Sequence, residues 1–396
     1  MKLHRDDPIP LYKQLLAEVR TRIVAGEWPN GSKLPTEAEL AAELGVSRVT
    51  IRQALSAAVE AGLVVRVPGK GTYVSWGTTG RRSQGFIGHV VPYLSHTFNV
   101  QMLLGIESAL KSEGYQLVFC NSEGDITLEQ RLLLNLQNEG MAGCIIEPVH
   151  DELRGPILHD WVARQFPVVM LDRYITGVDA DIVASDHFSG GYSVVQHLID
   201  QGYSDILYLA REPANLTSVT ERLHGYTAAM QDAGLAARPP FIIDGTIEEG
   251  LFPRPGMLTE REALAVQKIV AMLRSKQRPE AIVAMNDLHA LLVMEAVRQL
   301  RMTIPDDLAL VGFDDMDFAA TFNPPLTTVT QQSFQLGIEA ANLLLARIRG
   351  DLGPARQIRL PTHLIVRGSS MNPRREVTVP IHQPAVPASV PRTRTG

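Results

Sequence analysis

Two arginines stand one helical turn apart in a polar stretch near the start of the chain, at Arg48 and Arg52. On a helix, positions i and i+4 share a face, so both guanidinium groups would project together. Such a group can bind a guanine edge or a phosphate, Ser47 can cap the helix, and Thr50 can reach a phosphate. The apolar neighbours would pack inward: Val49, Ile51 and Leu55. We therefore predict a DNA-reading helix, although two arginines also suit a solvated face.

A lysine between two glycines provides a second candidate contact, at Gly69-Lys70-Gly71. Glycines let the backbone turn sharply and leave no Cβ atoms beside the lysine, so Lys70 can approach a DNA backbone or minor groove. An ordinary hairpin turn remains the alternative for this segment taken alone.

Polar residues follow several apolar runs of the larger, C-terminal part of the chain. Parallel sheets bind ligands at the carboxyl ends of their strands, so these positions predict a cleft. Carboxylates, an amide and an arginine suit a polyhydroxyl ligand, because each hydroxyl both donates and accepts hydrogen bonds. Capping of the next helix is the alternative for any single one, and for Asp186 the preferred one. The candidates that follow an apolar run are Ser95, His96, Phe98, Asp172, Asn286 and Asp314, and a further candidate, Arg222, lies early in a predicted helix.

The elements that must position the first set lie within residues 8–75. Leu11, Leu15, Val19 and Ile23 recur every four residues and predict one amphipathic helix. Thr36 and Glu39 have the spacing of a capping box for a second helix, and a third begins after Ser47. Apolar runs at 63–67 and 72–74 around the glycine turn predict a hairpin. This order is that of a winged helix-turn-helix, whose second paired helix enters the major groove.

From residue 86 onward, short apolar runs alternate with amphipathic stretches, which indicates βαβ units and a parallel sheet. About 285 residues exceed one comfortable sheet layer, so we expect two lobes. The predicted organisation is a winged helix-turn-helix domain at 1–75, a linker at 76–85, a two-lobed α/β effector-binding and dimerisation domain at 86–371, and a disordered Pro/Arg tail at 372–396.

Composition narrows the class of protein. Of 396 residues, 45% are apolar and 20% charged, which suits a soluble globular chain. The net charge is −6, but residues 1–75 carry ten Lys/Arg against eight Asp/Glu. That basic end is a weak pointer to nucleic acid. With only Cys120 and Cys144, a disulfide framework is excluded and a cytoplasmic chain is expected. No secretory signal, membrane-spanning run, metal-ligand spacing or nucleotide-binding motif is present in the sequence, so no cofactor is expected.

The first 75 residues resemble the GntR family of bacterial transcription regulators. The resemblance lies in Leu34-Pro35-Thr36-Glu37, in Ser47-Arg48 with Thr50-Ile51-Arg52, and in Gly69-x-Gly71-Thr72-Tyr73-Val74. It implies DNA contacts by Glu37 and by the wing. Many members carry a basic residue where this chain has Ala38, so one contact is expected to be absent. The full set of DNA-binding candidates is Glu37, Ser47, Arg48, Thr50, Arg52, Gln53, Gly69, Lys70 and Gly71.

The rest of the chain resembles the effector domain of lactose/galactose repressors, which is similar to periplasmic sugar-binding proteins. The resemblance lies in the segments 168–173, 185–191, 222–226, 285–287 and 311–315. It implies two Rossmann-like lobes, crossed three times by the chain, that close on a small molecule. A GntR-type head on this body resembles the arabinose-repressor group, which implies a pentose effector such as L-arabinose.

We therefore expect a homodimeric, non-enzymatic repressor of carbohydrate-use genes that a sugar effector releases from a palindromic operator. Two alternatives remain, a sugar-binding transport-type protein and a sugar-acting enzyme with a DNA-binding head. His96 and His289 lie near the expected cleft, but each suits a packing or surface role better than that of a catalytic base.

Overall fold

The computed structural model describes residues 10–29, 31–74, 84–94, 97–149, 156–211, 216–243 and 258–373. Most of the predicted linker and tail therefore lies outside the described residues. Among the helices that are described, none has the length and apolar run needed to cross a bilayer.

The N-terminal head contains three helices and a two-stranded antiparallel wing. The Thr36 hydroxyl accepts from Glu39 N and the Glu39 carboxylate accepts from Thr36 N, so the predicted capping box is confirmed. Three of the four predicted stripe residues of the first helix are buried at 1–5% exposure. The elements are α1 (Leu11–Val24), α2 (Glu37–Leu44), α3 (Arg48–Glu60), β1 (Val64–Val67) and β2 (Gly71–Val74). The winged helix-turn-helix order is confirmed.

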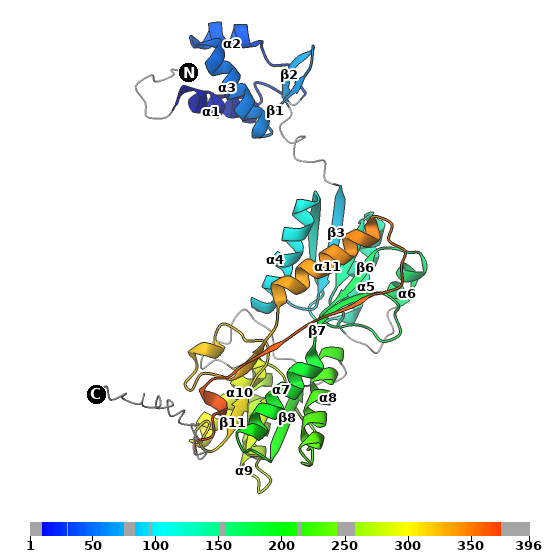
Figure 1. Cartoon of the computed structure of the whole chain (residues 1–396), viewed down its shortest axis with the longest axis vertical. Coiled ribbons are helices and arrows are strands. Elements are labelled where there is room, and N and C mark those ends of the chain that lie inside the picture. The colour runs from blue at the N-terminus through cyan, green and yellow to red at the C-terminus, as the bar shows by residue number, and fades with distance from the viewer. Residues whose placement is uncertain are drawn as a thin grey trace, which may run out of the picture.

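The first lobe of the body is built on a six-stranded parallel sheet in the order β13-β7-β6-β5-β3-β4. Helices α4 and α11 cover one face and α5 and α6 the other, each over its own apolar cluster (Figure 1). The elements are β3 (Gly85–Val91), α4 (Thr97–Ser112), β4 (Tyr115–Asn121), α5 (Ile126–Asn138), β5 (Gly143–Ile146), α6 (Pro156–Ala163), β6 (Val168–Leu171), β7 (Asp181–Ser185), α11 (Ser333–Ile348) and β13 (Gln357–Leu360).

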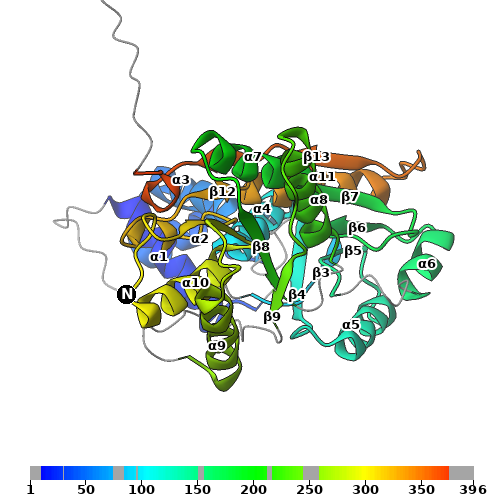
Figure 2. The same ribbon diagram turned by 90° about the horizontal axis from the view of Figure 1, so that it is seen from below.

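The second lobe is built on a four-stranded parallel sheet in the order β11-β10-β8-β9. Helices α7 and α8 lie on one side of this sheet and α9 and α10 on the other (Figure 2). The elements are α7 (His187–Asp200), β8 (Ile206–Arg211), α8 (Thr217–Asp232), β9 (Phe241–Ile243), α9 (Glu260–Arg274), β10 (Ala281–Ala284), α10 (Asp287–Leu300) and β11 (Ala309–Val311), with the short antiparallel pair β12 (Thr328–Thr330) and β14 (His363–Ile365).

The chain passes between the lobes three times: from β7 into α7, from β12 into α11, and from β13 into β14. In both sheets the chain order reverses beside the first strand, between β3 and β5 and between β8 and β10. Ligands of doubly wound sheets bind at such switch points, outside the carboxyl ends of the strands. The fold thus brings the carboxyl ends of two sheets to one place.

Glycines allow two helix pairs to pack with their backbones in contact. A Cβ atom added at Gly225 of α8 would lie 2.2 Å from the carbonyl oxygen of Phe188, and one at Gly191 of α7 would lie 2.3 Å from that of Arg222. Gly105 of α4 and Gly337 of α11 have the same relation to the facing helix, at 2.1 Å each. Because Arg222 lies on α8, the close packing of α7 against α8 fixes where the Arg222 side chain starts relative to α7.

Replacing Gly225 by alanine should therefore separate α7 from α8 and lower the free energy of unfolding by about 1–3 kcal/mol, the usual cost of overpacking. Gly234→Ala is the control, because Gly234 has φ +70° but no atom within 4 Å of an added Cβ. It should cost only the left-handed strain, about 1 kcal/mol. Chemical denaturation of both variants would check this, and equal losses would contradict the close-packing explanation.

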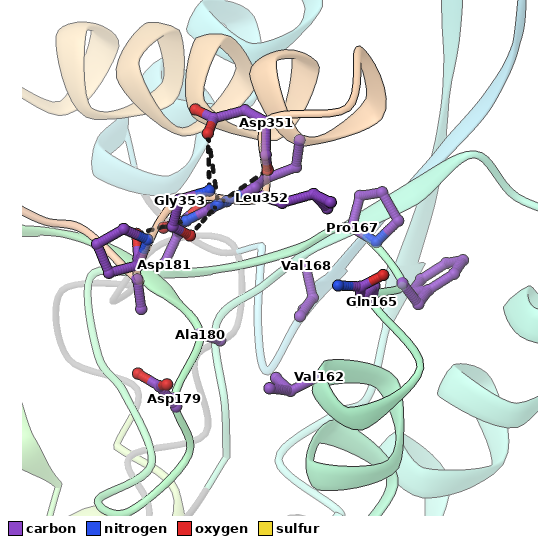
Figure 3. A pocket seen from close by; sticks show the side chains of 14 residues that line it. Val162, Gln165, Pro167, Val168, Asp179, Ala180, Asp181, Asp351, Leu352 and Gly353 are labelled. Atoms are coloured by element: carbon purple, nitrogen blue, oxygen red, sulfur yellow. Dashed lines mark hydrogen bonds and ion pairs between the residues drawn. The ribbon is translucent and has the colours of Figure 1, made fainter.

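A large surface cavity lies at the opposite, amino-terminal edge of the first lobe's sheet (Figure 3). Its polar groups bind one another: Asp181 accepts from Arg347 Nε at 2.7 Å and from the amide of Arg356 at 2.8 Å. Arg347 also donates to the carbonyl oxygens of Asp351, Gly353 and Pro354. This arrangement holds the segment that leads from α11 to β13, so we assign it a structural role.

Candidate functional site

The exposed face of α3 presents the predicted polar residues. Ser47 caps the helix by accepting from Thr50 N at 3.2 Å, while Arg48, Arg52 and Gln53 are exposed. The prediction that Val49 packs inward is wrong, because its side chain is 63% exposed. The buried positions are 51, 54, 55 and 58, so the inner face starts at Ile51 and leaves Val49 on the opposite side. Val49 thus presents an apolar side chain on the exposed face of α3.

Glu37 holds two arginines from different elements in place. Its Oε2 atom accepts from Arg52 Nε at 3.2 Å and from Nη2 at 3.1 Å, and its Oε1 atom accepts from Arg66 of β1 at 3.0 Å. The side chain thereby links the start of α2, the recognition helix and the wing. A carboxylate repels phosphate, so this geometry favours a positioning role for Glu37 over direct contact with the DNA backbone.

The wing turn has the shape that its glycines predict. Gly69 and Gly71 have φ values of +73° and +124°, in the region that L side chains rarely adopt. Lys70 between them is exposed, and its amide donates to Val67 O at 3.0 Å. An added Cβ at Gly71 would also lie 2.7 Å from Lys33 Cε. The turn therefore presents Lys70 on a backbone that tolerates no side chain beside it.

The body contains one cleft that collects most of the predicted effector-binding residues. Its empty space, counted out to the open mouth and including solvent there, is about 590 Å³. Ser95 and His96 lie outside the described residues. The lining residues that the sequence predicts are Phe98, Asp172, Arg222, Asn286 and Asp314.

Capping does not account for two of these residues. Asn286 does cap α10, since its side chain accepts from His289 N at 3.1 Å, and Asp186 caps α7 as expected. Asp172 and Asp314, by contrast, precede no helix and have φ values of +62° and +99°. Non-glycine residues in that region carry strain, and strained residues cluster at functional sites. Asp172 and Asp314 are therefore the candidates for which a role in the cleft is the best explanation.

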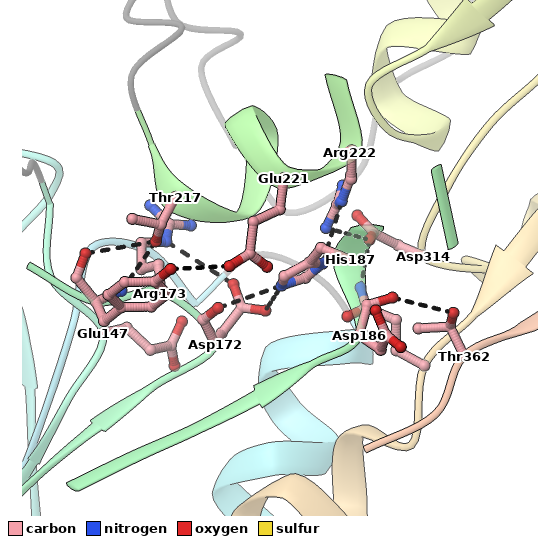
Figure 4. Close-up of polar contacts among 12 residues, drawn as sticks. Glu147, Asp172, Arg173, Asp186, His187, Thr217, Glu221, Arg222, Asp314 and Thr362 are labelled. Carbon is pink, nitrogen blue, oxygen red and sulfur yellow. Dashed lines mark hydrogen bonds and ion pairs between the residues drawn. The ribbon is translucent and has the colours of Figure 1, made fainter. Parts of the chain in front are cut away.

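A chain of polar contacts runs from one lobe to the other through the cleft wall (Figure 4). Arg222 Nε donates to His187 Nδ1 at 3.3 Å, which leaves His187 Nε2 facing Asp172 at 3.2 Å from its carbonyl oxygen and 3.4 Å from Oδ1. Arg222 Nη2 lies 3.5 Å from Asp314, which accepts from Gln331 at 2.7 Å. Arg222 also donates to Met285 O at 2.7 Å. These contacts thus connect Asp172 of the first lobe with Arg222 of the second.

Burial would raise the pKa of the Asp172 carboxyl, but hydrogen bonding from His187 and the charges of Arg173 and Arg222 outweigh it and lower that pKa to about 2. Asp172 therefore stays ionised and can accept hydrogen bonds from hydroxyl groups. Burial, and then the charges of Arg211 and Arg222, hold the pKa of His289 well below its usual range. His289 is buried and neutral, which agrees with the packing role expected for it.

Sequence reasoning missed four residues of this region. His187 directly follows the capping residue Asp186, and Glu147 directly follows β5, where it is 1% exposed and accepts from Asn99 at 3.2 Å. Arg173 and Arg211 line the cleft. Each ends an apolar strand or follows one within two residues, so the strand-end rule contained the signal although it was not applied to them.

Glu129 of α5 holds the segment after β5 by accepting from Val149 N at 2.8 Å. Burial raises its pKa from 4.5 to about 7. An acid whose pKa is higher in the folded state than in the unfolded state stabilises the fold while it is protonated. For Glu129 this contribution is complete below pH 4.5 and is lost as the pH rises through 7. That contribution amounts to about 3 kcal/mol.

Glu129→Gln keeps an oxygen for Val149, so it should remove this pH dependence and stabilise the protein at pH 8. Denaturant titrations between pH 4 and pH 8 would check the difference from the unchanged chain. Glu139→Gln, at the exposed end of the same helix, should leave the profile unaltered. Parallel profiles for Glu129→Gln and the unchanged chain would contradict the assignment.

Residues 11–74 match the family model of bacterial regulatory proteins of the gntR family, and residues 195–370 match that of the periplasmic binding protein-like domain. The chain joins a GntR-type helix-turn-helix to a periplasmic binding protein-like domain. The predicted resemblances are therefore confirmed.

Relatives share this organisation in whole or in part. The arabinose metabolism transcriptional repressor of Geobacillus stearothermophilus is 29% identical over 92% of this chain and 99% of that protein. The HTH-type transcriptional repressor PurR of Aliivibrio fischeri is 27% identical over 72% of this chain and 81% of that protein. The solved complex of the transcriptional regulator CelR with cellobiose has a TM-score of 0.62 and 25% identity, covering 85% of this chain and all of that one.

Proposed function

We propose that the chain is a ligand-responsive transcriptional repressor of carbohydrate-use genes, released from its operator by a sugar effector. The observation that carries the proposal is the presence in one chain of an exposed, arginine-bearing recognition helix and a polar cleft between two lobes. The relatives named above are transcriptional repressors or regulators, which supports the same function.

On the DNA side, α3 enters the major groove with Arg48 and Arg52 directed at base edges or phosphates, and Lys70 of the wing contacts the neighbouring backbone. One such head reads only a few base pairs. A two-fold dimer would read two half-sites about one helical turn apart, and for that reason a homodimer on a palindromic operator is part of the proposal.

On the effector side, Asp172, Asn286 and Asp314 would bind hydroxyl groups, Arg222 would donate to a ring or hydroxyl oxygen, and Phe98 would pack against an apolar sugar face. Support for a sugar comes from this donor and acceptor set and from the two relatives whose names include arabinose metabolism or a cellobiose complex. A pentose such as L-arabinose is the first neutral sugar to test.

Direct contacts between the two lobes could change when a ligand binds. Arg359 of β13 binds Glu221 of α8 through two bonds of 2.8 and 2.9 Å, and Thr97 of α4 donates to Asp317 at 2.6 Å. An effector that bridges the same lobes favours one arrangement of these contacts over another. To shift the population from 1:99 to 99:1, it must bind one arrangement about 5.5 kcal/mol more tightly.

We further propose that the chain is not an enzyme and acts in the cytoplasm, where its DNA lies. Across the described ranges, no group of His, Cys, Asp and Glu side chains has a metal-binding arrangement. His187 has both ring nitrogens engaged by protein groups, which leaves it unsuited to act as a general base on a bound sugar. Incubation with candidate sugars followed by product analysis should show no turnover.

A thermal-shift screen of the full chain against pentoses, hexoses and their oxidised or phosphorylated derivatives tests the effector class. A ligand that binds the native state at 100 times its Kd stabilises it by about 2.7 kcal/mol. Any compound that raises the melting temperature is then added to the protein bound to DNA selected from a random duplex pool. Release of that DNA is the expected result, and a chain that binds sugar but no duplex DNA would refute the proposal.

A further inference from the structure

Three guanidinium groups line the cleft, those of Arg173, Arg211 and Arg222. The carboxylates in the same lining are Asp172 and Asp314. Arg211 is 7% exposed and Arg222 is 6% exposed, so both charged groups are shielded from bulk water. A charge that is buried in this way needs a close partner of opposite charge. In all, the lining contains three guanidinium groups and two carboxylates.

Protein groups account for Arg222. Its Nη1 donates to Met285 O, its Nε to His187, and its Nη2 lies 3.5 Å from Asp314. Arg173 differs, because its Nε is buried with no hydrogen-bond partner among the described residues and lies 3.8 Å from the nearest carboxylate oxygen of Asp172. A buried N–H without an acceptor is costly, so an acceptor on a ligand at this place would be favoured.

Two described carboxylates near the lining are engaged by other arginines. Asp315 binds Arg367 at 2.7 Å and Glu221 binds Arg359. Burial, together with the charges of Asp314 and Asp315, raises the pKa of Asp287 well above its usual range, so Asp287 is held towards its neutral form. Glu147 is buried in the first lobe beside Asn99 and 3.8 Å from His89, away from the second-lobe wall that carries Arg211.

The start of α8 completes the basic end of the cleft. Leu216, Ser218 and Val219 line it, the N-cap Leu216 provides no capping side chain, and the first turn of this 16-residue helix contains no acid. Tyr174 N donates to Thr217 Oγ1 at 3.0 Å, so Arg173 lies beside the same helix end. First-turn amides and the helix dipole favour an anion there, and the guanidinium groups add charge-assisted donors.

From this geometry we propose that the effector is an anionic sugar derivative, whose carboxylate or phosphate group binds at the start of α8 between Arg173 and Arg211. Its hydroxyl groups bind Asp172, Asn286 and Asp314. The inference rests on the proposed function, because it names the chemical class of the ligand that the cleft receives.

Calorimetry on the full chain with matched ligand pairs tests the inference. The pairs are L-arabinose with L-arabinonate, D-ribose with D-ribose 5-phosphate, and D-glucose with D-gluconate and with D-glucose 6-phosphate. In at least one pair, the anionic member should bind roughly 10- to 100-fold more tightly than its neutral parent, the usual range for added charge-assisted bonds. The pairs also distinguish a carboxylate from a phosphate.

Arg211→Gln and Arg173→Gln should reduce the ratio of anionic to neutral affinity towards one. Arg274→Gln, an exposed change in the last turn of α9, is the matched control and should leave the ratio as it is. Neutral parents that bind as tightly as their anionic partners would overturn the inference, and this comparison needs no variant to fold. If a neutral sugar releases the DNA, the proposed function stands and the anionic class fails; if an anionic sugar binds through Arg211 without affecting DNA, the reverse holds.

Discussion

Replacing Arg48 or Arg52 by alanine is expected to abolish specific operator binding while leaving effector binding intact. Each bidentate contact to a base contributes about 1–3 kcal/mol of discrimination. The proposed dimer loses two copies at once, so affinity should fall roughly 30- to 20,000-fold. Both side chains are exposed on α3, so neither change removes core packing and the melting temperature should hold.

Gel shift or fluorescence anisotropy with the selected duplex would measure this loss, and calorimetry with the effector would supply the second readout. Arg274→Ala on α9 is the matched control, since it removes an exposed arginine of the body. Operator affinity that stays unchanged in both head variants would mean that α3 is not the recognition helix.

Asp314→Ala or Arg222→Ala should yield a repressor that binds its operator but ignores the inducer. Truncating one member of a buried, hydrogen-bonded charge pair costs about 2–5 kcal/mol of binding, or roughly 30- to 4,000-fold in affinity. Arg222→Ala also leaves Met285 O and His187 without their donor, so it should lower the melting temperature as well.

Asp314→Asn separates the loss of charge from the loss of structure. Asparagine tolerates the φ of +99° at this position and keeps an oxygen for Gln331 Nε2, now at 2.7 Å. We expect it to fold like the unchanged chain and still to bind effector at least tenfold more weakly, as the loss of a charged acceptor implies. Calorimetry that returned unaltered affinity for both Asp314 variants would show that the effector binds elsewhere.

The sequence specified the head well because local rules decide it. The capping box at Thr36, the cap at Ser47 and the glycine turn at 69–71 each depend on residues within four positions of one another. The prediction for Val49 failed because Val49 and Ile51 are both apolar, and the sequence alone does not show which of them faces the core. Only the packing of α1 against α3 defines which face is inner.

The body was predictable as alternating strands and helices but not in its crossings. β12, β13 and β14 have three or four residues each, and β13 and β14 contain no fully buried residue. They therefore lack the continuous apolar signal of a central strand. They pair with partners far along the chain, as β13 does with β7. Long-range pairing of this kind has no local mark in one sequence.

The cleft residues likewise divide into those that a local rule identifies and those that depend on the three-dimensional fold. Asp172, Asn286 and Asp314 end apolar strands and were found by that rule. His187 follows β7 and Arg211 ends β8, so the same rule applies to them, but the contact of His187 with Asp172 depends on how the two lobes face each other. The polar chain from Asp172 through His187 to Arg222 therefore had to be seen in three dimensions.

Fluorescence anisotropy of labelled operator duplex held by the full-length protein, with the effector titrated in, tests most directly whether the two modules communicate. We predict release of the duplex at effector concentrations near the Kd for the cleft, and a midpoint that moves upward by the same factor as that Kd in Asp314→Asn. A saturated cleft with the duplex still bound at undiminished affinity would contradict the account.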